Sequence, residues 1–94
     1  MTKIRKNEDI NFQIEILDGE GMVLVDESND KMHFINYTGL ILWEEINNDS
    51  IDRIYDRYRT KAKNIFQIDD ENIVKTTFDD FLDVLEKYSL IIRY

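Results

Sequence analysis

The side chains that could support catalysis or metal binding in this chain are His33 and two pairs of adjacent carboxylates, Asp69-Asp70 and Asp79-Asp80. The chain has no cysteine and no second histidine, so His33 lacks the partners that would complete a zinc site. Adjacent residues on a helix point about 100° apart, so neither carboxylate pair converges on one ion. No nucleophile paired with a base, calcium-loop spacing or glycine-rich phosphate loop is visible. The residues therefore predict a protein that is not an enzyme and that has no metal or cofactor.

Length and charge narrow the function further. The 94 residues favour one domain over residues 1–94. Twenty acidic and 12 basic residues give a net charge of −8, which opposes attraction to nucleic acid and to anionic lipid surfaces. No apolar run approaches the roughly 20 residues of a membrane-spanning helix, and the charged N-terminus does not resemble a secretory signal. We expect a cytoplasmic protein with no nucleic-acid or membrane partner.

Three short strands are predicted in the first third of the chain. Residues 12–16 alternate apolar and polar side chains, residues 22–25 form a short apolar run, and residues 31–35 are mostly β-branched, aromatic or otherwise apolar. Clusters of turn residues separate the three segments, so the connections are tight and the strands should form an antiparallel meander. Residues 1–9 are polar and are expected to form a loose segment.

Three helices are predicted to follow. Asn36 and Thr38 both suit the N-cap of the first helix, and Ser50 suits that of the second. Asp69 and Asp70 open the third helix, where acidic side chains favour the positive end of the helix dipole. The predicted ranges are residues 38–47, 51–63 and 69–88.

The predicted fold is therefore α+β and winged helix-turn-helix-like, with a three-stranded antiparallel sheet followed by three helices. Ile65, Phe66 and Ile68, which connect the second and third helices, should turn inward. Residues 90–92 should either add a short strand or cover the core.

A helix-turn-helix core raises the possibility of DNA binding, but the charges oppose it. The third helix carries seven acidic and two basic residues, whereas a recognition helix needs Arg or Lys near phosphates. The second helix has five basic and two acidic residues, and it could supply a basic face. A winged-helix regulator that binds nucleic acid or protein therefore remains the alternative.

Four stretches of the sequence resemble the PqqD-like family, also called RiPP recognition elements. They are residues 34–44 (FINYTGLILWE), 50–54 (SIDRI), 78–85 (FDDFLDVL) and 89–91 (SLI). They are similar to that family's strand-to-helix junction, its Trp-containing helix, its capped second helix, and its Asp-rich third helix with an apolar tail. The chain departs from the family at Asn48-Asp49 and at Ser89, which are turn positions.

The resemblance implies a non-catalytic module that binds the leader segment of a ribosomally synthesised precursor peptide. The leader would add as a strand beside the third strand, pack against the third helix, and be presented to a separate modifying enzyme. A radical-SAM enzyme, a leader peptidase or a cyclase would each be compatible. The expected peptide-binding residues are Lys31, Met32, His33, Phe34, Ile35, Asn36, Val74, Lys75, Phe78, Phe81 and Leu82.

The residue pattern also indicates peptide binding independently of the family resemblance. Met32 and Phe34 share one face of the third strand, and Lys31, His33 and Ile35 share the other. A strand at a sheet edge offers unpaired backbone groups to a peptide, or to a second copy of the chain. The third helix carries more apolar positions than one core-facing stripe needs, so part of it could line a groove. The alternative is that Phe34 covers the sheet and that Val74, Phe78 and Phe81 belong to the core.

Overall fold

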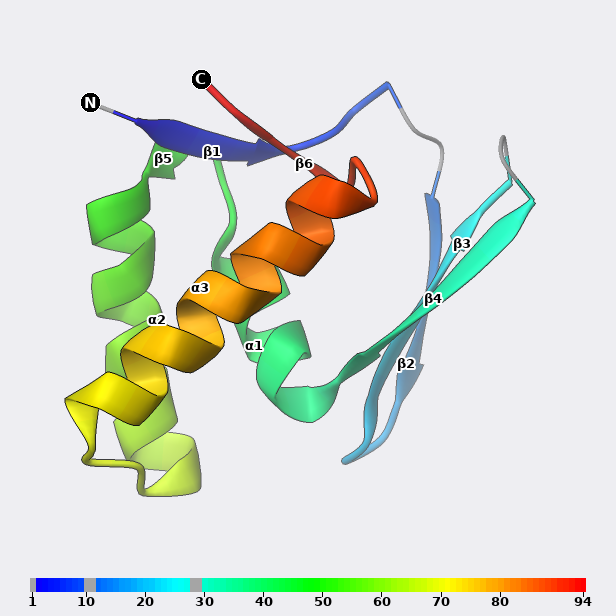
Figure 1. Cartoon of the computed structure of the whole chain (residues 1–94). Helices are drawn as coiled ribbons and strands as arrows, with labels where there is room; N and C mark the ends of the chain where they lie inside the picture. Colours follow the sequence, from blue (N-terminus) through cyan, green and yellow to red (C-terminus); the bar gives the residue numbers. More distant parts are fainter. Residues whose placement is uncertain (1, 10–11, 28–29) are drawn as a thin grey trace.

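A computed structural model describes residues 2–9, 12–27 and 30–94. It shows an α+β fold with antiparallel strands and three helices, as predicted (Figure 1). Among the described residues, the strands form two three-stranded sheets, ordered β2-β3-β4 and β5-β1-β6. The elements are β1 (Lys3–Lys6), β2 (Phe12–Leu17), β3 (Gly21–Asp26), β4 (Lys31–Asn36), α1 (Tyr37–Glu45), β5 (Asp49–Ser50), α2 (Ile51–Phe66), α3 (Glu71–Lys87) and β6 (Ile91–Arg93).

The β2-β3-β4 sheet is the predicted meander, and its pairing register decides which side chains face the helices. Met22 pairs with Ile35 and Leu24 with His33, so these side chains share one face, on which Met22, Leu24 and Ile35 are buried. Gly21 has a φ of 143°, and a Cβ there would lie 2.0 Å from the carbonyl oxygen of Ile35. Only glycine therefore fits at the start of β3, which pairs with the end of β4 at Asn36.

α1 begins immediately after β4, with no linker between them. Asn36, the last residue of the strand, is also the N-cap, because its side chain accepts a hydrogen bond from the backbone N–H of Gly39 at 2.9 Å. α1 is then apolar and buried from Gly39 to Trp43, and it packs against β3 and β4. The position of α1 is thereby fixed by the strand that precedes it.

α2 and α3 complete the core. Ser50 caps α2 as predicted, whereas Asp70, expected to open α3 together with Asp69, is the N-cap of that helix. The Ser50 hydroxyl accepts from the N–H of Arg53, and the Asp70 carboxylate accepts from the N–H groups of Asn72 and Ile73. α2 buries Ile54, Tyr58 and Ala62, and α3 buries one stripe at helical spacing. That stripe is Val74, Phe78, Leu82 and Leu85.

The second sheet corrects the expectation of a loose N-terminal segment. Lys3–Lys6 forms β1, which pairs with β5 on one side and with β6 on the other (Figure 1). Ile4 of this strand is fully buried. The strand could not be predicted from the sequence, because the segment KIRK is short and its partner strands, β5 and β6, lie about 50 and 90 residues further along the chain. Met1 lies outside the described residues. For the C-terminal tail, the sequence predicted either a short strand or a segment covering the core, and residues 91–93 form a strand, β6.

Smaller differences concern the ends of the helices. α2 continues to Phe66 and ends at Gln67, which adopts the left-handed conformation with a φ of 56°. Ile65 is therefore on the helix surface and 46% exposed, rather than turned inward as expected, whereas Phe66 and Ile68 do pack against the core. Within the described residues, no helix is both long and apolar enough to cross a bilayer.

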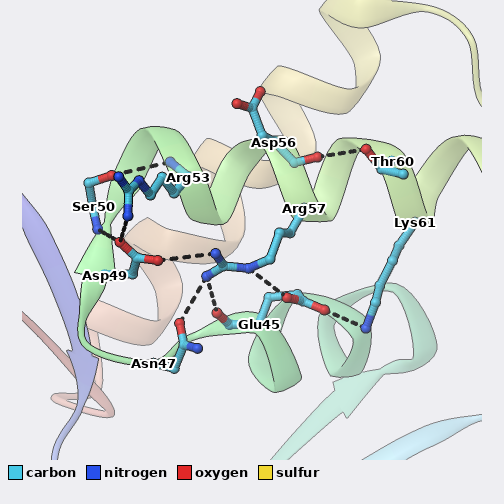
Figure 2. Close-up of polar contacts among 9 residues, drawn as sticks. All are labelled: Glu45, Asn47, Asp49, Ser50, Arg53, Asp56, Arg57, Thr60 and Lys61. Atoms are coloured by element: carbon cyan, nitrogen blue, oxygen red, sulfur yellow. Dashed lines mark hydrogen bonds and ion pairs between the residues drawn. The ribbon is translucent and has the colours of Figure 1, made fainter.

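A polar network fastens the turn between α1 and α2 (Figure 2). Arg57 donates to the carboxylate of Glu45 at 2.9 Å, to that of Asp49 at 3.1 Å and to the side chain of Asn47 at 2.9 Å. Lys61 pairs with the same Glu45. Burial alone would raise the pKa of Glu45, but the hydrogen bonds and charges of Lys61 and Arg57 outweigh it and lower that pKa. The pKa of Asp49 is also lowered, by the Ser50 N–H and by Arg57.

This network predicts a pH-dependent contribution to stability. A carboxyl group whose pKa is lower in the folded state stabilises the fold above its unfolded pKa, and that contribution is lost as the pH falls through the folded pKa. Arg57→Met should lower the unfolding free energy at pH 7 by about 1–3 kcal/mol and should flatten its fall between pH 5 and pH 3. Urea unfolding across that pH range measures both effects.

Arg53→Met is the matched control, because Arg53 is 76% exposed and lies 3.9 Å from Asp49. It should change the unfolding free energy by no more than about 0.5 kcal/mol. Equal losses in the two variants would show that the network does not hold the turn.

Candidate peptide-binding groove

A hollow lies between the edge of the β2-β3-β4 sheet and the C-terminal half of α3. It has a volume of about 440 Å³ and is mostly apolar. Its lining residues are Lys31, Met32, His33, Phe34 and Ile35 from β4, and Val84, Leu85, Tyr88 and Leu90 from α3 and the segment after it. We call this hollow the β4–α3 groove.

One wall of the groove is an open strand edge. β4 stands at the end of the sheet order and pairs with β3 alone among the described residues. In an antiparallel pair, alternate residues direct their N–H and C=O groups toward the partner and the others direct them outward. The outer edge of β4 therefore presents unpaired backbone donors and acceptors beside the groove.

Two contacts fix how α3 lies along β4. The His33 ring lies 4.8 Å from that of Tyr88, near the C-terminal end of α3. At the other end of β4, the backbone of Gly39 approaches both Ile35 and Phe81, since a Cβ on Gly39 would come within 2.4 Å and 2.7 Å of their side chains. The middle of β4 therefore faces the end of α3, and the end of β4 lies near the middle of α3.

The groove continues along α3 into a smaller hollow of about 230 Å³. Thr77, Asp80, Phe81 and Val84 line it, and Val84 is shared with the larger hollow. α3 thus presents a second stripe at helical spacing, beside the buried one: Ile73, Thr77, Phe81, Val84 and Tyr88. Ile73, Val84 and Tyr88 are 43–54% exposed, so the extra apolar width of this helix does face solvent.

The predicted peptide-binding residues on β4 and those on α3 differ in whether they line the groove. Lys31 to Ile35 all line the groove, with Met32 and Phe34 71% and 62% exposed. Phe34 pairs with Val23 on the face of the sheet opposite to the helices, so the alternative in which it covers the sheet stays open. Asn36 does not line the groove, because its side chain caps α1.

Among the five predicted residues of α3, three are placed in the core. Val74, Phe78 and Leu82 are at most 3% exposed, so their place on the groove surface was predicted wrongly. They occupy the buried stripe, and Phe78 packs against the rings of Tyr55 and Tyr58.

The other two predicted residues of α3 lie at the surface. Phe81 is half-buried and lines the smaller hollow. Lys75 is turned to the α2 side, where its ammonium group pairs with Asp79 at 2.9 Å and lies 5.0 Å from the Tyr55 ring.

The prediction missed four residues that line the groove, Val84, Leu85, Tyr88 and Leu90. The apolar width of the helix was the available signal, since residues 84, 85 and 88 contribute to it. To tell the buried stripe from the exposed one, the rotation of the helix about its own axis must be known, because successive residues are turned by about 100°.

The described residues contain no group of three or more potential metal-ligating side chains. Comparison of the chain with protein-family models, with curated proteins and with solved structures found no match. The PqqD-like resemblance and the binding roles of the groove residues therefore stay predictions.

The close approach at Gly39 predicts that this residue sets the distance between β4 and α3. Gly39→Ala should lower the unfolding free energy by about 1–3 kcal/mol, because its methyl group would overlap Ile35 and Phe81. Adding Phe81→Leu removes the ring atoms that the methyl group meets, so the double variant should recover part of the loss. Thermal unfolding of the wild type, both single variants and the double variant measures this coupling. Strictly additive effects would contradict it.

Proposed function

We propose that this chain is a peptide-recognition module that binds the leader segment of a ribosomally synthesised precursor in the β4–α3 groove. The leader would add as a strand to the open edge of β4 and would be presented to a separate modifying enzyme. A radical-SAM enzyme, a leader peptidase or a cyclase would suit this role. The observation that carries the proposal is the open edge of β4 beside an apolar hollow.

Strand addition draws on two kinds of interaction that the groove can offer. Backbone hydrogen bonds to β4 are independent of sequence and supply affinity for any extended peptide. Pockets for alternate side chains supply specificity. Val84 and Tyr88 are the exposed apolar side chains on the helix side of β4, and Phe34 is exposed on its opposite face. A tethered leader would then raise the concentration of the core peptide at the enzyme.

The charges support a peptide ligand over the winged-helix alternative of nucleic-acid binding. The basic residues of α2 were the one candidate for a phosphate-binding face, and most of them are paired with carboxylates. Arg57 and Lys61 pair with Glu45, and Arg59 pairs with Glu71 at 2.9 Å. Side chains engaged in this way are poorly disposed to contact phosphates.

The order of elements is compatible with a winged helix-turn-helix-like arrangement, in which the β2-β3-β4 sheet precedes three packed helices. We include this finer fold assignment, and a cytoplasmic location, in the proposal. The second sheet does not obstruct the groove, because its strands contribute no lining residue to it.

The proposal predicts saturable binding of a leader peptide to β4 and α3. Synthetic leaders from small open reading frames beside this gene should shift the amide resonances of residues 31–36 and 81–90 in an NMR titration. Phe34→Asp should weaken binding at least about tenfold, because a peptide strand added to β4 would lie beside the exposed Phe34 ring on the outer face of the sheet.

Ile14→Asp is the matched control. Ile14 is 49% exposed on β2, the opposite edge strand of the same sheet, so the substitution introduces the same charge away from the groove. Its affinity for the leader should equal that of the wild type. Loss of binding in Ile14→Asp alone, or shifts confined to α2 on addition of duplex DNA, would refute the proposal.

A further inference from the structure

The two ends of the groove carry opposite charges. Lys31 stands where β4 begins, and its side chain lies on the same face of the strand as those of His33 and Ile35, toward α3. Asp80 lines the smaller hollow at the other end, next to Phe81. Because β4 rises about 3.3 Å per residue, the four steps from Lys31 to Ile35 span about 13 Å along the strand.

Both residues are exposed, and Lys31 pairs across the sheet with Asp26, which is buried. Neither Lys31 nor Asp80 forms an ion pair with another described residue. The neighbouring carboxylates of α3 are engaged instead, since Asp79 pairs with Lys75, and Asp83 and Glu86 pair with Arg93. Among these carboxylates of α3, Asp80 is therefore the one that could pair with a positively charged group of a bound peptide.

We propose that the groove selects, and orients, a peptide segment that carries an acidic and a basic side chain on the same face. The acidic side chain would lie at Lys31, the basic one at Asp80, and apolar side chains between them would face Val84 and Tyr88. Side chains of a strand that share a face are an even number of positions apart, so the separation is about four or six residues. This inference deepens the proposed function and rests on it.

The charges would set the direction of the ligand as well as its affinity. Backbone hydrogen bonds alone permit parallel or antiparallel addition to β4, since both orders of pairing occur in sheets. A reversed peptide would place like charges together at both ends of the groove, which is unfavourable. The same apolar peptide without the charge pair should therefore bind more weakly and in both directions.

The test begins with a display library of random nine-residue peptides, selected on the immobilised full chain and counter-selected on Phe34→Asp. Enriched peptides should carry Asp or Glu and Lys or Arg about four or six positions apart, in one order. With a nitroxide at its acidic end, such a peptide should broaden the amide resonances near Lys31 rather than those near Asp80.

The double variant K31E/D80K exchanges the two charges and leaves the net charge unchanged. The selected peptide should bind it at least about tenfold more weakly, or bind with the nitroxide moved to the region of residue 80. D56K/K63E, a similar exchange on α2, should leave affinity and direction as in the wild type.

The possible failures are distinguishable. Enriched peptides without the charge pair, or an affinity and direction that K31E/D80K leaves unchanged, would overturn this inference alone. A library that yields no peptide able to discriminate the wild type from Phe34→Asp would overturn the proposed function with it. A dimer of the free chain that Phe34→Asp converts to a monomer would place a second copy in the groove, and would also overturn the inference.

Discussion

The passage of β4 directly into α1 is the constraint on which the rest of the structure depends. Asn36 ends the strand and caps the helix, so the chain has no linker in which the two elements could reorient. Gly39, in the first turn of α1, then lets Ile35 and Phe81 approach. The edge of β4 and the surface of α3 are therefore held at a fixed separation, and the groove between them follows from that geometry.

The same constraint explains why β4 differs from the other edge of its sheet. Ile14 and Ile16 of β2 lie on the helix-facing side, but α1 packs against β3 and β4, so both isoleucines remain about half-exposed. No residue of β2 lines the β4–α3 groove. β4 has unpaired backbone groups, and it also lies beside an apolar surface that can distinguish between peptide side chains. Recognition by strand addition requires both features.

Local signals in the sequence were sufficient for the elements of the larger sheet and for the helices. The alternation over residues 12–16 and the capping residues Asn36, Ser50 and Asp70 are short-range features, and each acts as its chemistry predicts. β1 could not be found in this way. Its partners lie at residues 49–50 and 91–93, and three of its four residues are charged, so its burial depends on pairing that no local pattern encodes.

The site was predictable to a similar extent. The division of the strand 31–35 into two faces follows from its period of two, and it located one wall of the groove. The other wall was placed on Val74, Phe78 and Leu82, because apolar content identifies a broad helix surface but not which part of it is buried. Resolving that choice requires the packing of α2, whose Tyr55 and Tyr58 cover Phe78.

Intermolecular NOEs between an isotope-labelled chain and an unlabelled bound peptide would test the central claim most directly. Strand addition predicts contacts in a regular register between the peptide backbone and β4, Lys31–Asn36, with peptide side chains against Val84 and Tyr88. Contacts with β2 or α2, or a helical peptide in the groove, would contradict it.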